Sequence, residues 1–152
     1  MIILNLHLTL ESYLERTFHF FLPHPEKILK NDCKFATKLT LVRASGLYED
    51  KLCVALKHLN TLRNNIVHNL EHEISIKELD NIGRPFGKTW VEMVKSNNDK
   101  SKDTRIMMLA FLLHSQFKGA LDALENNSQN HEVISALIYN AKYPKNPLPD
   151  FT

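Results

Sequence analysis

Apolar residues recur at helical spacing along most of the chain, and prolines and glycines divide this pattern into segments. Residues 2–10 alternate between apolar and polar in the manner of a strand, but a helical period also fits from Leu6 onward. We favour a helix that starts within the first nine residues and ends near Leu22, because two prolines follow there. A short helix over residues 26–30 is expected next.

Two longer helices are predicted in the rest of the first half. The first follows an N-cap at Asn31–Asp32, is closed by Gly46 and carries the apolar markers Phe35, Leu39, Val42 and Leu47. The second runs from about Tyr48 or Glu49 to the neighbourhood of His68. Its apolar stripe, spaced by three, four or seven residues, consists of Leu52, Leu56, Leu59, Ile66 and Leu70.

The second half of the chain also has a helical pattern. Ser75 and Glu78 have capping-box spacing and open a short helix that extends to Ile82. A loop over residues 83–87 separates it from another short helix over residues 88–96, which carries the single tryptophan of the chain.

A polar stretch over residues 97–102 is expected to be a solvated loop. Asp103 or Thr104 then caps a long amphipathic helix. Its inward-facing residues are expected to be Ile106, Leu109, Ala110, Leu113, Phe117, Ala120, Leu121 and Leu124. A last helix is predicted over residues 132–142.

These elements predict an all-α fold, an up-and-down bundle of four to five main helices plus short helices. A chain of 152 residues with 43% hydrophobic content most simply forms one domain with its own core. We assign this domain to residues 1–143, and the proline-rich residues 144–152 to an extended tail.

Composition restricts the classes of function. A net charge of +2 is too small to indicate a nucleic-acid surface by itself, although it leaves room for a local basic patch. Cys33 and Cys53 have no metal-ligand spacing, and no carboxylate cluster or Cys/His set suggests a metal, so we expect no cofactor. The apolar N-terminus lacks a positive region and is interrupted by Glu11, so we expect a cytoplasmic protein with no membrane segment.

The stretch Leu59–Asn69 places polar chemistry at the end of a helical pattern, with Arg63 on the core-facing stripe. A guanidinium keeps its charge there, so it has to meet a carboxylate, face a partner subunit or line an anion-binding cavity. Glu11 and Glu15 on the first helix are the acids to test as its partners. The simpler alternative is an arginine that extends to the edge of the bundle.

His68 lies five residues after Arg63, or about 140° around an ideal helix. The two side chains therefore converge only if the helix ends or kinks, or if a dimer axis brings two copies together. Asn69 is a candidate left-handed residue for such an end. A histidine near a helix C-terminus also interacts favourably with the helix dipole without any catalytic role.

The segment Arg63-Asn64-Asn65-Ile66-Val67-His68 resembles the Arg-x4–6-His signature of HEPN domains, in which Asn, Asp or His commonly follows the arginine. The resemblance extends to an acid-bearing first helix and to a second helix that ends at residues 44–47, and it covers about half of the chain. One departure is Leu70, which stands where a toxin subgroup paired with nucleotidyltransferase antitoxins has a tyrosine.

The resemblance implies a homodimer in which two motifs face each other in a cleft, and a metal-independent endoribonuclease of the toxin or defence type. It implies an RNA substrate and an antitoxin protein as possible partners. An arginine fork can hold the scissile phosphate, and a histidine can transfer protons near neutral pH. The catalytic residues would be Arg63, His68 and Asn64, and the supporting residues Glu11, Glu15 and Asn65.

Two other interpretations remain open. Relatives such as the mannitol-operon-regulator-like proteins carry a similar Arg-Asn-x-x-x-His helix end, so the chain can instead be a non-catalytic HEPN-like dimeric regulator or binding module. The third is a helical bundle with a chance match.

An RNA approach surface, or simply a solvated face, is formed by the basic residues Arg16, Lys34, Lys38, Arg43, Lys57 and His58.

Overall fold

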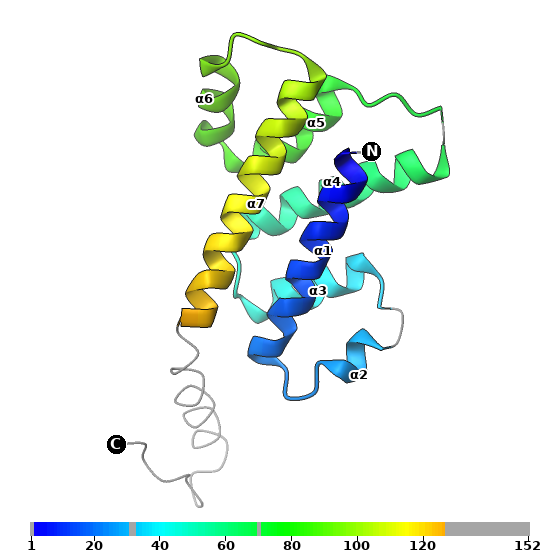
Figure 1. Ribbon diagram of the computed structural model, residues 1–152, viewed down its shortest axis with the longest axis vertical. Coiled ribbons are helices and arrows are strands. Elements are labelled where there is room, and N and C mark those ends of the chain that lie inside the picture. The colour runs from blue at the N-terminus through cyan, green and yellow to red at the C-terminus, as the bar shows by residue number, and fades with distance from the viewer. Residues whose placement is uncertain (1, 31–32, 70, 127–152) are drawn as a thin grey trace, which may run out of the picture.

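The computed structural model describes residues 2–30, 33–69 and 71–126. Within them the chain is an all-α helical bundle, as the hydrophobic pattern predicted. The elements are α1 (Ile2–Phe21), α2 (Glu26–Leu29), α3 (Phe35–Ser45), α4 (Asp50–His68), α5 (Ile76–Gly83), the 3-10 helix η1 (Arg84–Phe86), α6 (Lys88–Ser96) and α7 (Lys102–Asn126). In Figure 1, α1 and α7 lie side by side and α4 crosses behind them.

The ends of the first helices follow local backbone chemistry. Gly46 closes α3 in the left-handed conformation, with a φ of 70° that glycine adopts without strain. The N-cap residue of α3 is Lys34, so the predicted cap at Asn31–Asp32 is wrong; those two residues lie outside the described part. Glu49 precedes α4 in an extended conformation, close to the predicted start.

The second half contains two corrections. The predicted capping box is present, because Ser75 and Glu78 exchange side-chain and backbone hydrogen bonds. The predicted loop over residues 83–87 instead contains η1, since Pro85 has the fixed φ that a tight helical turn needs. The cap of the long helix lies two or three residues earlier than predicted, because the hydroxyl of Ser101, and not Asp103 or Thr104, accepts the first-turn hydrogen bond from the Thr104 backbone amide.

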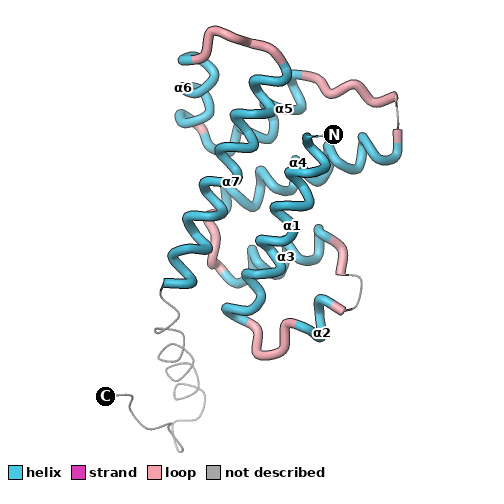
Figure 2. Tube along the Cα trace, in the orientation of Figure 1, coloured by secondary structure: helices cyan, strands magenta, loops and turns pink. Residues whose placement is uncertain are grey.

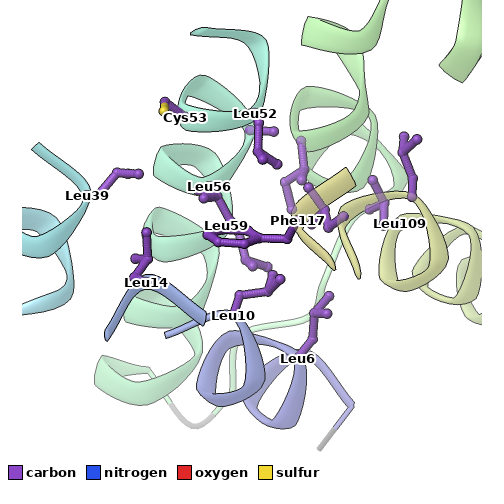
Figure 3. Close-up of a cluster of buried hydrophobic side chains, with 14 of the residues drawn as sticks. Leu6, Leu10, Leu14, Leu39, Leu52, Cys53, Leu56, Leu59, Leu109 and Phe117 are labelled. Carbon is purple, nitrogen blue, oxygen red and sulfur yellow. The ribbon is translucent and has the colours of Figure 1, made fainter. Parts of the chain in front are cut away.

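One hydrophobic core joins α1, α3, α4 and α7 (Figure 3). Leu10, Leu56 and Phe117 are almost completely buried in it. Of the stripe predicted for α4, the first three leucines are buried and Ile66 is half-buried, which shows that the helix leaves the core towards its C-terminal end. Core residues that the pattern did not single out include Cys53, Ala55, Leu62 and Leu112.

Figure 2 shows the loops that connect the helices. α5 and α6 lie at one end beside the start of α7, and α2 and α3 lie towards the other. Among the described residues, no helix combines the length and the apolar character needed to cross a bilayer. The predicted helix at 132–142, the tail at 144–152 and Leu70 lie outside the described residues.

Candidate functional site

A cavity of about 470 Å³ opens where the C-terminal half of α4 passes the start of α1 and α3. α4 contributes most of the polar groups, α1 contributes two titratable groups, and the residues around the start of α3 complete the wall. The lining residues are His7, Glu11, Lys34, Phe35, Ala36, Asn60, Arg63, Asn64 and His68. Three residues predicted as catalytic therefore line one cavity within a single chain.

Arg63 is half-buried at this cavity and not packed in the core. Its Nη1 donates a hydrogen bond to Asn64 Oδ1 at 3.1 Å, which fixes the guanidinium beside the adjacent amide. No carboxylate among the described residues forms an ion pair with it, although Glu11 lines the same cavity. The Arg63 side chain therefore lines a polar cavity.

His68 is the last residue of α4 and is exposed. It lines the same cavity as Arg63 although α4 does not end between the two residues, so one chain brings both side chains to one site without a dimer axis. Asn69 ends the helix in an extended conformation, with φ of −134° and ψ of 98°, and the left-handed conformation predicted for it is wrong.

His7 is a cavity residue that sequence reasoning missed. The imidazole is only 3% exposed; its Nε2 donates to Asn60 Oδ1 at 3.1 Å, and its ring lies 4.2 Å from the ring of Phe35. Burial lowers the pKa of His7 below its usual value, although the hydrogen bond to Asn60 and the nearby Glu11 oppose the shift. The candidate site thus contains one buried histidine that is neutral at pH 7 and one exposed histidine.

Glu11 and Glu15 do not pair with Arg63, which corrects the sequence-based expectation. Both carboxylates accept hydrogen bonds from Lys38 Nζ, at 2.7 and 2.5 Å, and the lysine side chain is 8% exposed. Burial opposes the charge of Lys38, but the two carboxylates outweigh it and raise the lysine pKa. Glu11 lines the cavity as a member of this ion network, whereas Asn65 is exposed and does not line it.

The basic residues considered as an RNA approach surface do not form one uniform patch. Lys38 is buried and is therefore excluded from it. Arg16 pairs with Glu125, and Arg43 pairs with Asp50 at 2.7 Å. Lys34 lines the cavity, and Lys57 and His58 are exposed on α4.

Comparison of the chain with family models, with curated proteins and with solved structures finds no match. Within the described part of the chain, no group of three or more His, Cys, Asp or Glu side chains is arranged to hold a metal ion. The chemistry of the site therefore has to be argued from the cavity itself.

Proposed function

We propose that this chain is a metal-independent endoribonuclease of the HEPN type, acting as a cytoplasmic toxin or defence effector. The observation that supports this most is the shared cavity of Arg63, Asn64 and His68. It combines a fixed guanidinium, an amide and an accessible imidazole, which are the groups that phosphodiester cleavage by a ribose 2′-OH needs.

The proposed reaction divides into two proton transfers around one displacement. An imidazole takes the proton of the 2′-OH, the oxygen attacks the adjacent phosphorus, and the bond from phosphorus to the 5′-oxygen breaks. The leaving oxygen takes a proton from a second imidazole, which gives a 2′,3′-cyclic phosphate and a 5′-OH end. Arg63 binds the phosphate oxygens and stabilises the charge that develops on them, and Asn64 orients the guanidinium through their hydrogen bond.

In the proposed homodimer, the cavities of two chains face each other, so that the two His68 copies act as base and acid. Each His68 lies at an exposed helix end, where a second chain and an RNA strand can both reach it. An antitoxin protein that covers this helix end would hold the enzyme inactive. The competing function, a HEPN-like regulator, uses the same cavity to bind an anion without cleavage.

A cleavage assay in EDTA tests the proposal. We expect purified protein to cut mixed RNA, and Arg63→Ala and His68→Ala each to lower the rate by about 100-fold or more while the fold persists. His19→Ala is the matched control, since His19 is an exposed residue of α1 outside the cavity. RNA that stays intact across several substrates, with a folded wild-type protein, would favour the regulator.

A further inference from the structure

A second cavity, of about 400 Å³, is lined by residues of α5, η1, α6 and α7. In Figure 1, α6 lies on the opposite side of the view from the C-terminal end of α4. The cavity wall along α6 is apolar and consists of Trp90, Val91 and Val94. Val91 is 46% exposed, so part of this apolar wall is open to solvent. The volume falls within the range of small-molecule sites.

The indole of Trp90 is held rigidly in this wall. Gly83 lies against its face so closely that a Cβ at position 83 would come within 2.7 Å of Trp90 Cγ. On the other side, Trp90 Nε1 donates to Asp80 Oδ1 at 3.3 Å. Because glycine allows the contact and the hydrogen bond fixes the ring, the apolar surface exists before any ligand binds.

The largely buried side chain of Arg105 also lines this cavity. Arg105 pairs with Asp80 through Nη1, and its side chain is 12% exposed. Its Nε is buried and has no hydrogen-bond partner among the described residues. Because this Nε is shielded from solvent, a ligand in the cavity does not reach it, and Arg105 contributes to the site through its positive charge and the part of its side chain that lines the cavity.

The rim of the cavity adds positive charge. Arg84 and Lys95 both line the cavity and are exposed, and neither forms an ion pair within the described ranges. Together with Arg105 they outnumber Asp80, the single acidic residue of the lining. The cavity therefore combines an apolar wall with an excess of cationic groups.

We propose that this cavity binds a small amphipathic anion, a carboxylate, sulfonate or phosphate attached to an aromatic or aliphatic body. The body packs on Trp90, Val91 and Val94, and the anionic group lies at the cationic rim. This site is separate from the cavity of Arg63, and the proposal does not depend on ribonuclease activity.

Trp90 makes the site directly observable, since it is the only tryptophan of the chain. The probe is anilinonaphthalene sulfonate, an aromatic anion that quenches tryptophan fluorescence by energy transfer, and the comparison ligand is uncharged N-phenylnaphthylamine. We expect saturable quenching of Trp90 at one equivalent of the sulfonate, at least tenfold weaker binding of the uncharged compound, and displacement of the sulfonate by decanoate.

Matched variants distinguish the contribution of the cationic rim from non-specific hydrophobic binding. The double variant Arg84→Ala/Lys95→Ala should weaken sulfonate binding about tenfold, a change of about 1.4 kcal/mol. Val91→Asp, a change at an exposed position, should weaken it further. Lys77→Ala/Lys88→Ala removes two exposed lysines outside the cavity and should bind as the wild type does.

Circular dichroism and thermal midpoints confirm that each variant is folded. Equal affinity for the charged and uncharged compounds, or wild-type affinity in the Arg84→Ala/Lys95→Ala protein, would overturn the proposal. So would the absence of any saturable change in Trp90 fluorescence.

Discussion

His7 shows how burial sets the chemistry of a single residue. Its pKa lies below the usual value of 6.5 because burial disfavours the imidazolium. At a pH between the folded and unfolded pKa values, the unfolded chain binds more protons, so stability rises with pH in this window. The contribution of His7 is fully present above 6.5 and is lost as the pH falls through its folded pKa.

We therefore predict that, as the pH is lowered from about 7.5 to 5.5, the free energy of unfolding decreases less in His7→Gln than in the wild type. Urea denaturation across this range measures the free energy of unfolding of both proteins. A His7→Gln curve parallel to that of the wild type would show that burial does not lower this pKa.

Lys38 is the second residue whose environment makes a clear prediction. Replacement by methionine keeps the buried stem but leaves Glu11 and Glu15 without their common partner. We expect a loss of about 2 kcal/mol in the free energy of unfolding, the lower end for a buried pair because Glu15 is 42% exposed. Lys57→Met, on an exposed part of α4, should change the free energy of unfolding little. Equal losses in the two variants would show that the ion pairs of Lys38 with Glu11 and Glu15 do not stabilise the fold.

The sequence pattern identified the motif residues, but the partner predicted for Glu11 and Glu15 was wrong. Arg63 stood out because it interrupts a leucine stripe, and the same reasoning applies to Lys38, which lies three residues after Phe35 and four before Val42. His7 likewise lies three residues before Leu10 on the first helix. Pairing across helices is not encoded in spacing along one helix, so only the packed structure shows that the lysine takes both carboxylates.

At the scale of elements, the contact between Gly83 and Trp90 joins α5 to α6. Gly83→Ala should destabilise the protein by about 2–3 kcal/mol, because the new methyl group overlaps the indole. Gly119→Ala is the matched control: no atom lies within 4 Å of a Cβ there, and alanine in the middle of α7 should stabilise by about 0.5–1 kcal/mol. Thermal and urea denaturation measure both; equal tolerance of the two alanines would show that the indole can move.

Helix boundaries were predictable where a local signal fixes them. Gly46 and the pair of Ser75 and Glu78 act through hydrogen bonds and backbone conformations of neighbouring residues, which the sequence displays directly. Ser101 caps α7 by accepting a hydrogen bond from the backbone amide of Thr104, three residues later. Asp103 and Thr104 are also residue types that cap helices, so the sequence alone did not single out Ser101. The extended conformation of Asn69 depends on where the chain goes next, and no local pattern determines that.

At the scale of the whole molecule, the bundle brings two distant parts of the sequence to one cavity. α1 supplies His7 and Glu11, and the end of α4 supplies Arg63 and His68. The helical pattern predicted the bundle, because each long helix has one continuous apolar face. The cavity was not predictable, since it depends on how far α4 extends beyond the core.

A mixing experiment tests whether the proposed active site is shared between two chains. Arg63→Ala and His68→Ala proteins, each inactive alone, should regain part of the RNA cleavage rate when unfolded together and refolded as a mixture. A shared cleft keeps one intact Arg63 and one intact His68 in the mixed dimer, so one of the two proton transfers retains its imidazole and only part of the rate returns. Light scattering should show a dimer for every sample. A mixture that stays inactive would place the complete site within one chain.

The proposed activity of the cavity at the end of α4 is the cleavage of RNA without a metal. The most direct measurement is the cleavage of RNA in EDTA by the wild type and His68→Ala, with the chemical ends of the products mapped. We predict 2′,3′-cyclic phosphate and 5′-OH ends from the wild type, and a rate lower by about 100-fold or more in His68→Ala. Uncut RNA with the folded wild type, or cleavage unchanged by the loss of His68, would contradict the account.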